Sequence, residues 1–571
     1  RPRYYQKHKN IPHYQPWTYS IRKDSITGWC SWWAFFRGCK QSDVDAIMKV
    51  WQEKNLADYG YRFIQLDDGF QGGHDGDRKR PEMKIKYYIG GRPETWLQWK
   101  RDKFPGGMYG YSRSVETAGF DPAIWTGCFF TDKQIADEHP DWFVQGKDGK
   151  PFVGDWVTYV VDSTNPEAAD ALIRPTYRGL KNAGFEYVKI DQLRHMLYDN
   201  LNLNHEYLKK HNKRPDDIFR AYLKIARQEL GEDCFILSCW GVLPESIGIA
   251  DACRIGGDGY GPVTMQQYNS WNGIVWRNDP DHCDISPRKK AKSEGNVRQR
   301  LNTKAASNES IIRPALASIA GCMLMLSDKP EVYSDDNNLI GVKRSAPVLF
   351  SVPGQLYDFD PKKTDIIKEI DRASIKSGTG VSKIDGDRSG YVCPFWLNEF
   401  NTPLGHWHVL HRLNWDKKAA ADPTEVKFAD LGLDPDKEYI VHEFWSDKTF
   451  GVVKNQISLG KLEPMGLQSL AIRQKLDRPQ LISTNRHLSQ GAAEIEKLRW
   501  QNNTLTGRSK VITGDRYTLT VYVPADFKLD SASVNNKKAR TERNGNVLKV
   551  SYLPEETASA GWKIAFRHLN K

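Results

Sequence analysis

Eight short apolar runs within the first 330 residues each end in acidic, aromatic or sulfur-bearing residues, and this recurrence constrains the fold most. A buried parallel strand reads as a continuous apolar run. In a (β/α)8 barrel the chemistry lies at the C-terminal ends of such strands. The runs cover residues 27–36, 61–68, 122–130, 187–192, 235–240, 252–258, 273–281 and 322–328. We therefore predict an α/β enzyme fold, a (β/α)8 TIM barrel with its active site at the strand ends.

Segments with helical periodicity lie between several of these runs, as parallel βα units with right-handed crossovers require. We expect Ser42 to cap the first helix, which should stop at Gly60, and Pro175 to interrupt the second. The helical segments cover residues 44–58, 166–183, 216–230 and 309–320.

Beyond about residue 353 the apolar runs become short and alternating, which is typical of antiparallel sandwiches. An Asn-Gly pair at Asn544-Gly545 predicts a hairpin turn. For the last β region we favour a structural buttress over a sugar-binding module. The predicted division is an N-terminal arm (1–20), the catalytic barrel (21–355), a linker (356–385), a β-sandwich (386–475) and a second all-β domain (476–571).

Composition indicates an ordinary globular protein. The chain has 571 residues, 39% hydrophobic and 27% charged, which suits two to four domains. No uncharged apolar run is long enough to span a bilayer. The nine cysteines show no metal-ligand spacing, so we expect them to be mostly free and buried.

Two features of the composition leave alternatives open. The 19 tryptophans suit either stacking on sugar rings or a tryptophan-rich core. The net charge of +11 raises nucleic acid as a partner, but the densest basic run, 287–292, has no recognisable binding module around it. A solvated basic face is favoured, and we expect no nucleic-acid partner. The sequence starts at Arg1 without Met, from which we expect an extracytoplasmic (periplasmic or secreted) protein.

The run YVKIDQ places Lys189 and Asp191 on one face of a strand. If that face lines the barrel mouth, the lysine would hold Asp191 ionised, which suits a carboxylate nucleophile. The alternative is a structural ion pair at the rim.

The run CRIGGDGYGP offers Arg254 and Asp258 with small residues between them, so that a ligand can approach closely. A carboxylate less strongly paired than Asp191 can stay protonated and act as a general acid. Two such carboxylates are what glycoside hydrolysis requires, and the retaining geometry predicts a separation of about 5 to 7 Å. The alternative is a glycine-rich turn with one solvated Asp.

The remaining candidates also follow predicted strands. Asp67 and Asp68 in LDDGFQ suit sugar hydroxyls or a cation, although Asp-Asp-Gly is also a common turn. WRNDPDHCD suggests a metal site, but a turn that stabilises the rim is favoured. The other candidates for contact with substrate are Trp32, Trp125, Cys239 and Gly241.

These motifs, in this order, resemble clan D of the retaining α-glycosidases, meaning glycoside hydrolase families twenty-seven and thirty-six with the related raffinose synthases. The likeness covers about residues 25 to 330. It rests on GWCSWWAFF, LDDGFQ, FPGGM, EHPDWFV, YVKIDQ, SCWG, CRIGGD, NDPD and ASIAGCMLMLSD.

The resemblance implies a role for each candidate. Asp191 would be the nucleophile, Asp258 the acid/base residue, and Arg254 its support. Asp67 and Asp68 would hold the galactose 4- and 6-hydroxyls. The other implied sugar contacts are Lys189, with Cys239 and Gly241 beside the 2-hydroxyl.

Two departures concern regions outside the sugar pocket. The segment CFFTDKQ (128–134) replaces a usual Glu-Pro-Glu element, and only some twenty residues precede the barrel.

We therefore expect a retaining exo-α-galactosidase that needs no metal or organic cofactor and binds a carbohydrate with a terminal α-linked galactose or related sugar. The alternatives are a galactosyltransferase of raffinose-synthase type, an α-N-acetylgalactosaminidase or β-L-arabinopyranosidase, and a catalytically dead carbohydrate-binding barrel.

Overall fold

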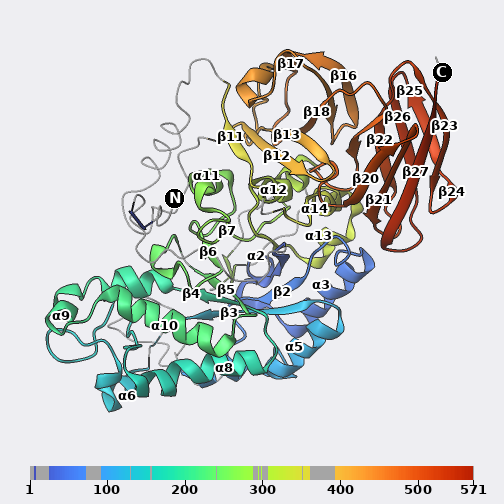
Figure 1. The fold of residues 1–571 in the computed structure, drawn as a ribbon. Coiled ribbons are helices and arrows are strands. Elements are labelled where there is room, and N and C mark those ends of the chain that lie inside the picture. The colour runs from blue at the N-terminus through green and yellow to red at the C-terminus, as the bar shows by residue number, and fades with distance from the viewer. Residues whose placement is uncertain are drawn as a thin grey trace.

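The structure is a computed structural model, drawn in Figure 1, with a barrel followed by two β domains. It describes Gln6 and Lys7, residues 25–72, 92–128, 130, 132–154, 157–239, 241–286, 307–349, 352–359 and 392–569, and two short strands, β8 (Ser293–Glu294) and β9 (Val297–Arg298). The basic run 287–292 and most of the predicted linker lie outside the described residues.

Eight parallel strands form the barrel, in the spatial order β10-β1-β2-β3-β4-β5-β6-β7. Each coincides with one of the eight apolar runs, so the predicted fold class is confirmed. Closure between β7 and β10 comes from hydrogen bonds such as Met323 N to Asn278 O, 3.0 Å. The strands are β1 (Thr27–Cys30), β2 (Phe63–Leu66), β3 (Asp121–Gly127), β4 (Tyr187–Asp191), β5 (Phe235–Ser238), β6 (Ala252–Arg254), β7 (Arg277–Asp279) and β10 (Leu324–Leu326).

One buried cluster collects side chains from six of the eight strands and two flanking positions, and it fills the barrel interior. Tyr187 packs edge to face between Phe63 and Phe235, with ring centroids 5.6 and 5.1 Å apart. The barrel is thus a packed core and not a pore, which leaves only its mouth for chemistry.

Helices surround the barrel, and their polar caps explain where several begin. The first long helix starts at Gln41, one residue before the predicted cap Ser42. Lys40 N donates to the Asp43 carboxylate at 2.9 Å, so Asp43 closes this end. The helices are α2 (Ser31–Phe35), α3 (Gln41–Glu53), α4 (Pro93–Leu97), α5 (Gly107–Thr117), α6 (Lys133–Glu138), α7 (Pro166–Ala168), α8 (Arg174–Asn182), α9 (His205–Lys210), α10 (Pro215–Leu230), α11 (Pro262–Gln267), α12 (Ser307–Ala320), α13 (Pro330–Ser334) and α14 (Leu339–Ser345).

The second predicted helix is interrupted, as its internal proline requires. Asn165 caps its start by accepting from Glu167 N at 3.0 Å. A π-helical turn, Ala169–Ile173, then separates α7 from α8. Pro175 has no N–H to donate and its ring displaces a carbonyl one turn earlier, so the regular hydrogen-bond ladder cannot pass through it.

The first β domain, orange in Figure 1, contains a six-stranded sheet in the order β11-β12-β13-β18-β15-β16 and a two-stranded sheet of β14 and β17. Its first strand includes Leu356 and Tyr357, the first two residues of the predicted linker. The strands are β11 (Gln355–Tyr357), β12 (Phe395–Thr402), β13 (Gly405–Leu413), β14 (Thr424–Lys427), β15 (Glu438–Glu443), β16 (Lys448–Lys454), β17 (Gln456–Leu459) and β18 (Leu467–Gln474).

The last domain, red in Figure 1, is a sandwich of two antiparallel sheets, β19-β22-β26-β25 and β20-β21-β27-β23-β24. The predicted turn at Gly545 joins β25 to β26, and its φ of 57° suits glycine. The strands are β19 (Gln480–Thr484), β20 (Ile495–Gln501), β21 (Thr504–Val511), β22 (Tyr517–Tyr522), β23 (Phe527–Val534), β24 (Lys537–Lys538), β25 (Arg540–Asn544), β26 (Val547–Tyr552) and β27 (Ala558–His568).

This last sandwich docks on the barrel through charged groups. Asp515 accepts from Tyr59 Oη at 2.8 Å and pairs with both terminal nitrogens of Arg344. The guanidinium of Arg486 lies 4.5 Å from the centre of the Tyr59 ring. These contacts hold the last sandwich against the barrel, and its role as a structural buttress stays a prediction.

All nine cysteines are free and buried, as predicted. Among the described residues, no helix combines the length and apolar character needed to cross a bilayer.

Candidate active site

The ten predicted site residues lie on barrel strands or in the segments that directly follow them. Because neighbouring strands are parallel, the ends of all eight meet at one rim. The residues are Trp32 in α2; Asp67 and Asp68 after β2; Trp125 in β3; Lys189 and Asp191 in β4; Cys239 and Gly241 after β5; Arg254 in β6; and Asp258 after β6.

A buried ion pair joins β4 to β2. Lys189 Nζ lies 3.0 Å from Asp67 Oδ2, and both side chains are 4% exposed. Burial would raise the pKa of Asp67, but Lys189 and then His282 hold that pKa below its usual value. Burial would lower the pKa of Lys189, but Asp67 holds it well above its usual value. Both groups are therefore charged at neutral pH.

The partner of Lys189 differs from the sequence expectation, which placed it beside Asp191. The lysine spans to β2 instead, while the Asp191 charge acts on it without a direct pair and helps to raise the pKa of Lys189. The reason is geometric: β2 and β4 lie on either side of β3, and the long lysine side chain, directed into the barrel, reaches past β3 to the end of β2.

Asp68, next to Asp67 in the sequence, forms a separate ion pair with Arg37. Arg37 Nε lies 2.5 Å from Asp68 Oδ2, and Gln71 Nε2 donates to the other oxygen at 3.1 Å. Burial nevertheless raises the pKa of Asp68, against the opposing effect of Arg37. The Arg37 side chain is 45% exposed and that of Asp68 is 7% exposed, so the cation of this pair lies toward solvent and the carboxylate is buried.

Asp191 is held by two N–H donors. Trp125 Nε1 donates to Oδ2 at 2.9 Å, and Gln192 N donates to Oδ1 at 2.7 Å. Gln192 has a φ of 66°, in the left-handed region that a glutamine rarely occupies. Residues held in such conformations cluster at active sites, since the surrounding structure must enforce them.

Arg254 is the central cation of the β6 side. It is almost fully buried, and its Nη2 lies 2.9 Å from Asp281 Oδ1 and 3.2 Å from Asp258 Oδ1. Asp281 also accepts from Gly259 N at 2.6 Å, which ties it to the loop that carries Asp258. Burial would raise the pKa of Asp281, but Arg254 and His282 hold it far below its usual value. Asp281 is therefore a fixed anion behind Asp258.

Asp258 has the opposite electrostatic environment. Desolvation by the surrounding walls raises its pKa, Arg254 lowers it, and the nearby anions Asp281 and Asp191 raise it further. The net effect is upward, although the side chain is 59% exposed. The solvent-accessible edge and the crowded remainder of this side chain describe a carboxyl at the lip of a pocket. We expected Asp258 to be less strongly paired than Asp191 and to have Arg254 as its support, and Arg254 does contact it at 3.2 Å.

Cys239 and Gly241 line the neighbouring strand end. Cys239 is buried, its Sγ lies 3.9 Å from a guanidinium nitrogen of Arg254, and burial raises the pKa of its thiol. Gly241 has a φ of 80° and its carbonyl accepts from Cys253 Sγ at 3.3 Å. Trp32 is half-buried in α2 and packs edge to face on Phe36, with ring centroids 5.2 Å apart.

One buried group offers metal-ligand atoms: those of Cys30, Asp67 and His282 lie within 4.8 Å of one another. The residues present do not suit a cation. Lys189 already places its ammonium on the Asp67 oxygen that Cys30 Sγ approaches at 3.5 Å. Burial also raises the pKa of the Cys30 thiol, so it stays protonated and is a poor ligand.

Sequence reasoning missed Asp281, His282 and Arg37 as site residues. The first two were interpreted as part of a rim turn, and that turn does exist, but its charges reach Arg254 and Asp67. The acidic residue and histidine that follow the strand were the signal available in the sequence. In the structure, a φ of 79° at Asp281 marks a position that the fold constrains.

Comparison with known proteins agrees with this geometry. Residues 33–223 match the family model for melibiase. α-Galactosidase AgaA of Geobacillus stearothermophilus is 26% identical over 145 residues, which is 25% of this chain and 18% of that protein. The chain thus matches less than a fifth of the length of this curated relative.

Two solved structures share the fold. A GH27 β-L-arabinopyranosidase from Geobacillus stearothermophilus has a TM-score of 0.57 and 13% identity, covering 81% of this chain and 98% of that one. α-Galactosidase I from Mortierella vinacea has a TM-score of 0.50 and 13% identity, covering 80% and 98%. Residues 33–223 are therefore similar to the melibiase family of glycoside hydrolases, and the two solved structures show that the chain shares their barrel fold.

Proposed function

We propose that this protein is a retaining exo-α-galactosidase. The observation that carries the proposal is the pair of carboxyl groups at one rim in unlike surroundings. Asp191 is fixed by two N–H donors, and Asp258 has a raised pKa at the lip of the same mouth. The Asp191 charge raises the pKa of Asp258, so the two groups lie close enough to interact electrostatically.

The first step forms a glycosyl-enzyme. Asp191 Oδ attacks the anomeric carbon, the glycosidic C–O bond breaks, and the protonated Asp258 transfers its proton to the leaving oxygen. The anions behind Asp258 favour its protonated form and so prepare it for this role.

The second step releases the sugar. Asp258, now a carboxylate, accepts a proton from water as the water oxygen attacks the anomeric carbon, and the bond to Asp191 breaks. Two inversions give net retention. Both steps use carboxylates and water, and the proton returns Asp258 to its starting state.

The sugar would be seated by the charged floor of the mouth. Asp67 and Asp68 offer carboxylate oxygens to the hydroxyls at C4 and C6, and Lys189 offers N–H groups from the same network. Cys239 and Gly241 line the side near the 2-hydroxyl, and Trp32 and Trp125 supply aromatic walls. The fixed charges of Asp67 and Lys189 would be oriented before the substrate arrives, which favours binding of a defined sugar.

The sugar itself is the first point to test. Relatives with this fold include the arabinopyranosidase and a putative α-N-acetylgalactosaminidase from Bacillus halodurans. We expect the p-nitrophenyl α-galactoside to be cleaved with the highest kcat/KM among the α-galactoside, β-L-arabinopyranoside and α-N-acetylgalactosaminide. A higher value for either of the other two would replace galactose with that sugar.

Transfer to an alcohol in place of water is the second candidate, of raffinose-synthase type. Incubation of the α-galactoside with added sucrose distinguishes the two. Hydrolysis predicts free galactose only, and transfer predicts a trisaccharide. A dead sugar-binding barrel predicts binding of galactose with no turnover.

A further inference from the structure

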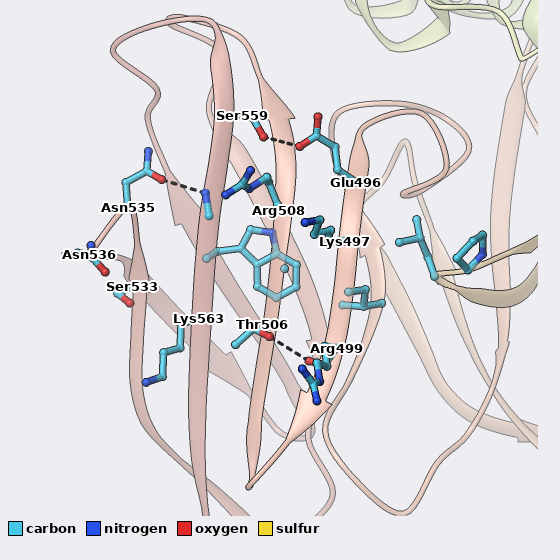
Figure 2. A pocket seen from close by; sticks show the side chains of 16 residues that line it. Glu496, Lys497, Arg499, Thr506, Arg508, Ser533, Asn535, Asn536, Ser559 and Lys563 are labelled. Carbon is cyan, nitrogen blue, oxygen red and sulfur yellow. Dashed lines mark hydrogen bonds between the residues drawn. The ribbon is translucent and has the colours of Figure 1, made fainter.

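The last sandwich carries a groove of about 730 Å³ on its outer face (Figure 2). The five-stranded sheet forms the floor, with side chains from β20, β21, β27 and β23. One wall is the turn between β12 and β13 of the first β domain, at Pro403 and Leu404. The groove therefore exists only where the two β domains meet.

Strand register places a row of polar side chains on this floor. In the backbone register, Lys497 on β20 lies opposite Arg508 on β21, and Arg508 lies opposite Gly561 on β27. Two residues farther along each strand, Arg499 lies opposite Thr506, and Thr506 lies opposite Lys563. Successive strand residues alternate between faces, so these side chains all leave the sheet on its outer side.

The four basic side chains of this floor are exposed and lack a carboxylate partner within the part of the chain that the structure describes. They are Lys497, Arg499, Arg508 and Lys563. The one acidic group in the lining, Glu496, accepts from Ser559 Oγ. The groove thus keeps a net positive charge that its own residues do not neutralise.

Two glycines shape the floor. A Cβ at Gly507 would lie 2.1 Å from Cζ2 of Trp562, so this glycine allows the buried indole to pack directly beneath the floor. A Cβ at Gly561 would meet nothing within 4 Å, because it would project into the open groove. A glycine is therefore not needed at position 561 to avoid a clash, and it leaves space there for a ligand.

Neutral hydrogen-bonding groups complete the lining. Asn535 Oδ1 accepts from Gly561 N at 2.9 Å, which fixes the turn of Asn535 and Asn536 at the groove edge (Figure 2). Both asparagines have positive φ values, 47° and 63°, as a tight hairpin turn requires. Cations beside amides and hydroxyls suit a ligand that carries both negative charge and hydroxyl groups.

We propose that this groove binds an acidic glycan, a chain of sugars bearing carboxylate or sulfate groups. The charge of the groove selects the anion, and the volume of about 730 Å³ has room for several sugar units. The choice of a glycan over another polyanion rests on the proposed function, since the barrel acts on sugars. The groove and the barrel mouth are separate sites, so binding here holds the enzyme on a substrate without touching the catalytic carboxylates.

Titration calorimetry on the full chain tests the proposal with four ligands of matched length. They are oligogalacturonate, a sulfated galactan oligosaccharide, neutral galactan and single-stranded dT oligonucleotide. The first two separate carboxylate from sulfate. We expect binding to at least one of them that weakens with added salt, and none to neutral galactan.

Two independent variants locate the binding. Arg508→Glu with Lys563→Glu should weaken binding by about tenfold or more, because it replaces two attractions with two repulsions. The control is Lys454→Glu with Arg540→Glu, which changes the net charge equally on exposed positions of β16 and β25 and should change binding by less than about twofold. Gly561→Leu fills the groove without changing charge and should abolish binding.

Cleavage of the small aryl galactoside is measured in parallel and should be unchanged in every variant. If the protein cleaves no glycoside yet the variants lose acidic-glycan binding, the proposed function fails and the groove stands. The proposal is overturned if neither acidic glycan binds, if the control pair weakens binding as much as the groove pair, or if dT binds as tightly with the same sensitivity to the variants.

Discussion

The barrel mouth and the groove of the last sandwich both contain several cationic side chains, but these differ in burial and in pairing with carboxylates. In the mouth, Lys189 and Arg254 are buried, and each faces a buried carboxylate within 3.0 Å. In the groove, Lys497 and Arg508 stand exposed on a sheet, and within the described chain no carboxylate faces them.

This difference follows from solvation. A buried charge must be compensated by a partner at close range, and removal of the partner is costly. The pairing fixes the side chain, so a mouth built this way has one geometry. An exposed charge is solvated by water and gains little from a partner, so it stays available to a ligand. We therefore read the mouth as a site for chemistry and the groove as a site for attachment.

The largest expected effect comes from removing the proposed nucleophile of the barrel mouth. Asp191→Asn keeps the shape of the side chain and should lower kcat by roughly 10⁴-fold, because the amide cannot form the glycosyl-enzyme. The matched control is Asp170→Asn, at an exposed carboxylate of the same barrel, which should leave kcat unchanged. Steady-state rates with circular dichroism spectra measure this. Turnover within tenfold of wild type would remove Asp191 from the mechanism.

The next effect concerns stability. Lys189→Met leaves Asp67 as a buried anion without its cation and should lower the free energy of unfolding by about 3–5 kcal/mol. Lys475→Met removes the exposed pair with Glu438 and should cost less than about 1 kcal/mol. Urea unfolding measures both. Equal losses would mean that burial does not govern these pairs.

The difference in the free energy of unfolding between the wild type and Lys189→Met should depend on pH in a defined direction. In the wild type the lowered pKa of Asp67 adds stability above the ordinary Asp pKa, and this is lost as the pH falls through the lower folded value. Without Lys189, burial raises the Asp67 pKa instead. Acidification then protonates Asp67 and removes the buried, uncompensated charge that destabilises the variant. The stability gap should narrow as the pH falls through the ordinary Asp pKa. A gap that widens on acidification would contradict the assigned charges.

A smaller change should appear in the pH profile of Asp281→Asn. The Asp281 charge raises the pKa of Asp258, and its loss also leaves Arg254 free to stabilise the Asp258 carboxylate. Both effects lower the pKa of the general acid. The alkaline limb of kcat/KM should therefore move to lower pH, as measured with the aryl galactoside. An upward move would show that another group controls that limb.

The smallest effect is expected in the groove. Arg508→Glu with Lys563→Glu should change the free energy of unfolding by no more than about 0.5 kcal/mol per position, because both side chains are exposed and have no carboxylate partner among the described residues. Thermal unfolding against wild type measures this. A larger loss would show that these cations support the sandwich.

Much of the fold was accessible from the sequence because local patterns encode it. Each apolar run became a strand, since burial on both faces requires an unbroken apolar stretch. Pro175 interrupted its helix because its ring forbids the regular bonds. The position of Ser42 was less informative, since either Asp43 or Ser42 can cap that end and only the packed structure decides.

The positions of the candidate site residues at the strand ends were predictable, and their hydrogen-bond and ion-pair partners were less so. Asp191 and Asp258 were expected at the strand ends and lie there. That Lys189 pairs with Asp67 depends on β2 and β4 lying on either side of β3 in the barrel, which no local motif states. Asp281 likewise reaches Arg254 only because β6 and β7 are neighbours in the sheet.

The central claim is that Asp191 attacks the sugar, and trapping the glycosyl-enzyme tests it most directly. A fluorinated α-galactosyl fluoride, which forms this intermediate faster than water removes it, is incubated with the wild-type protein. Peptide mass mapping should then find one galactosyl adduct, on Asp191. An adduct on another carboxylate, or turnover of the fluoride with none on Asp191, would contradict the account.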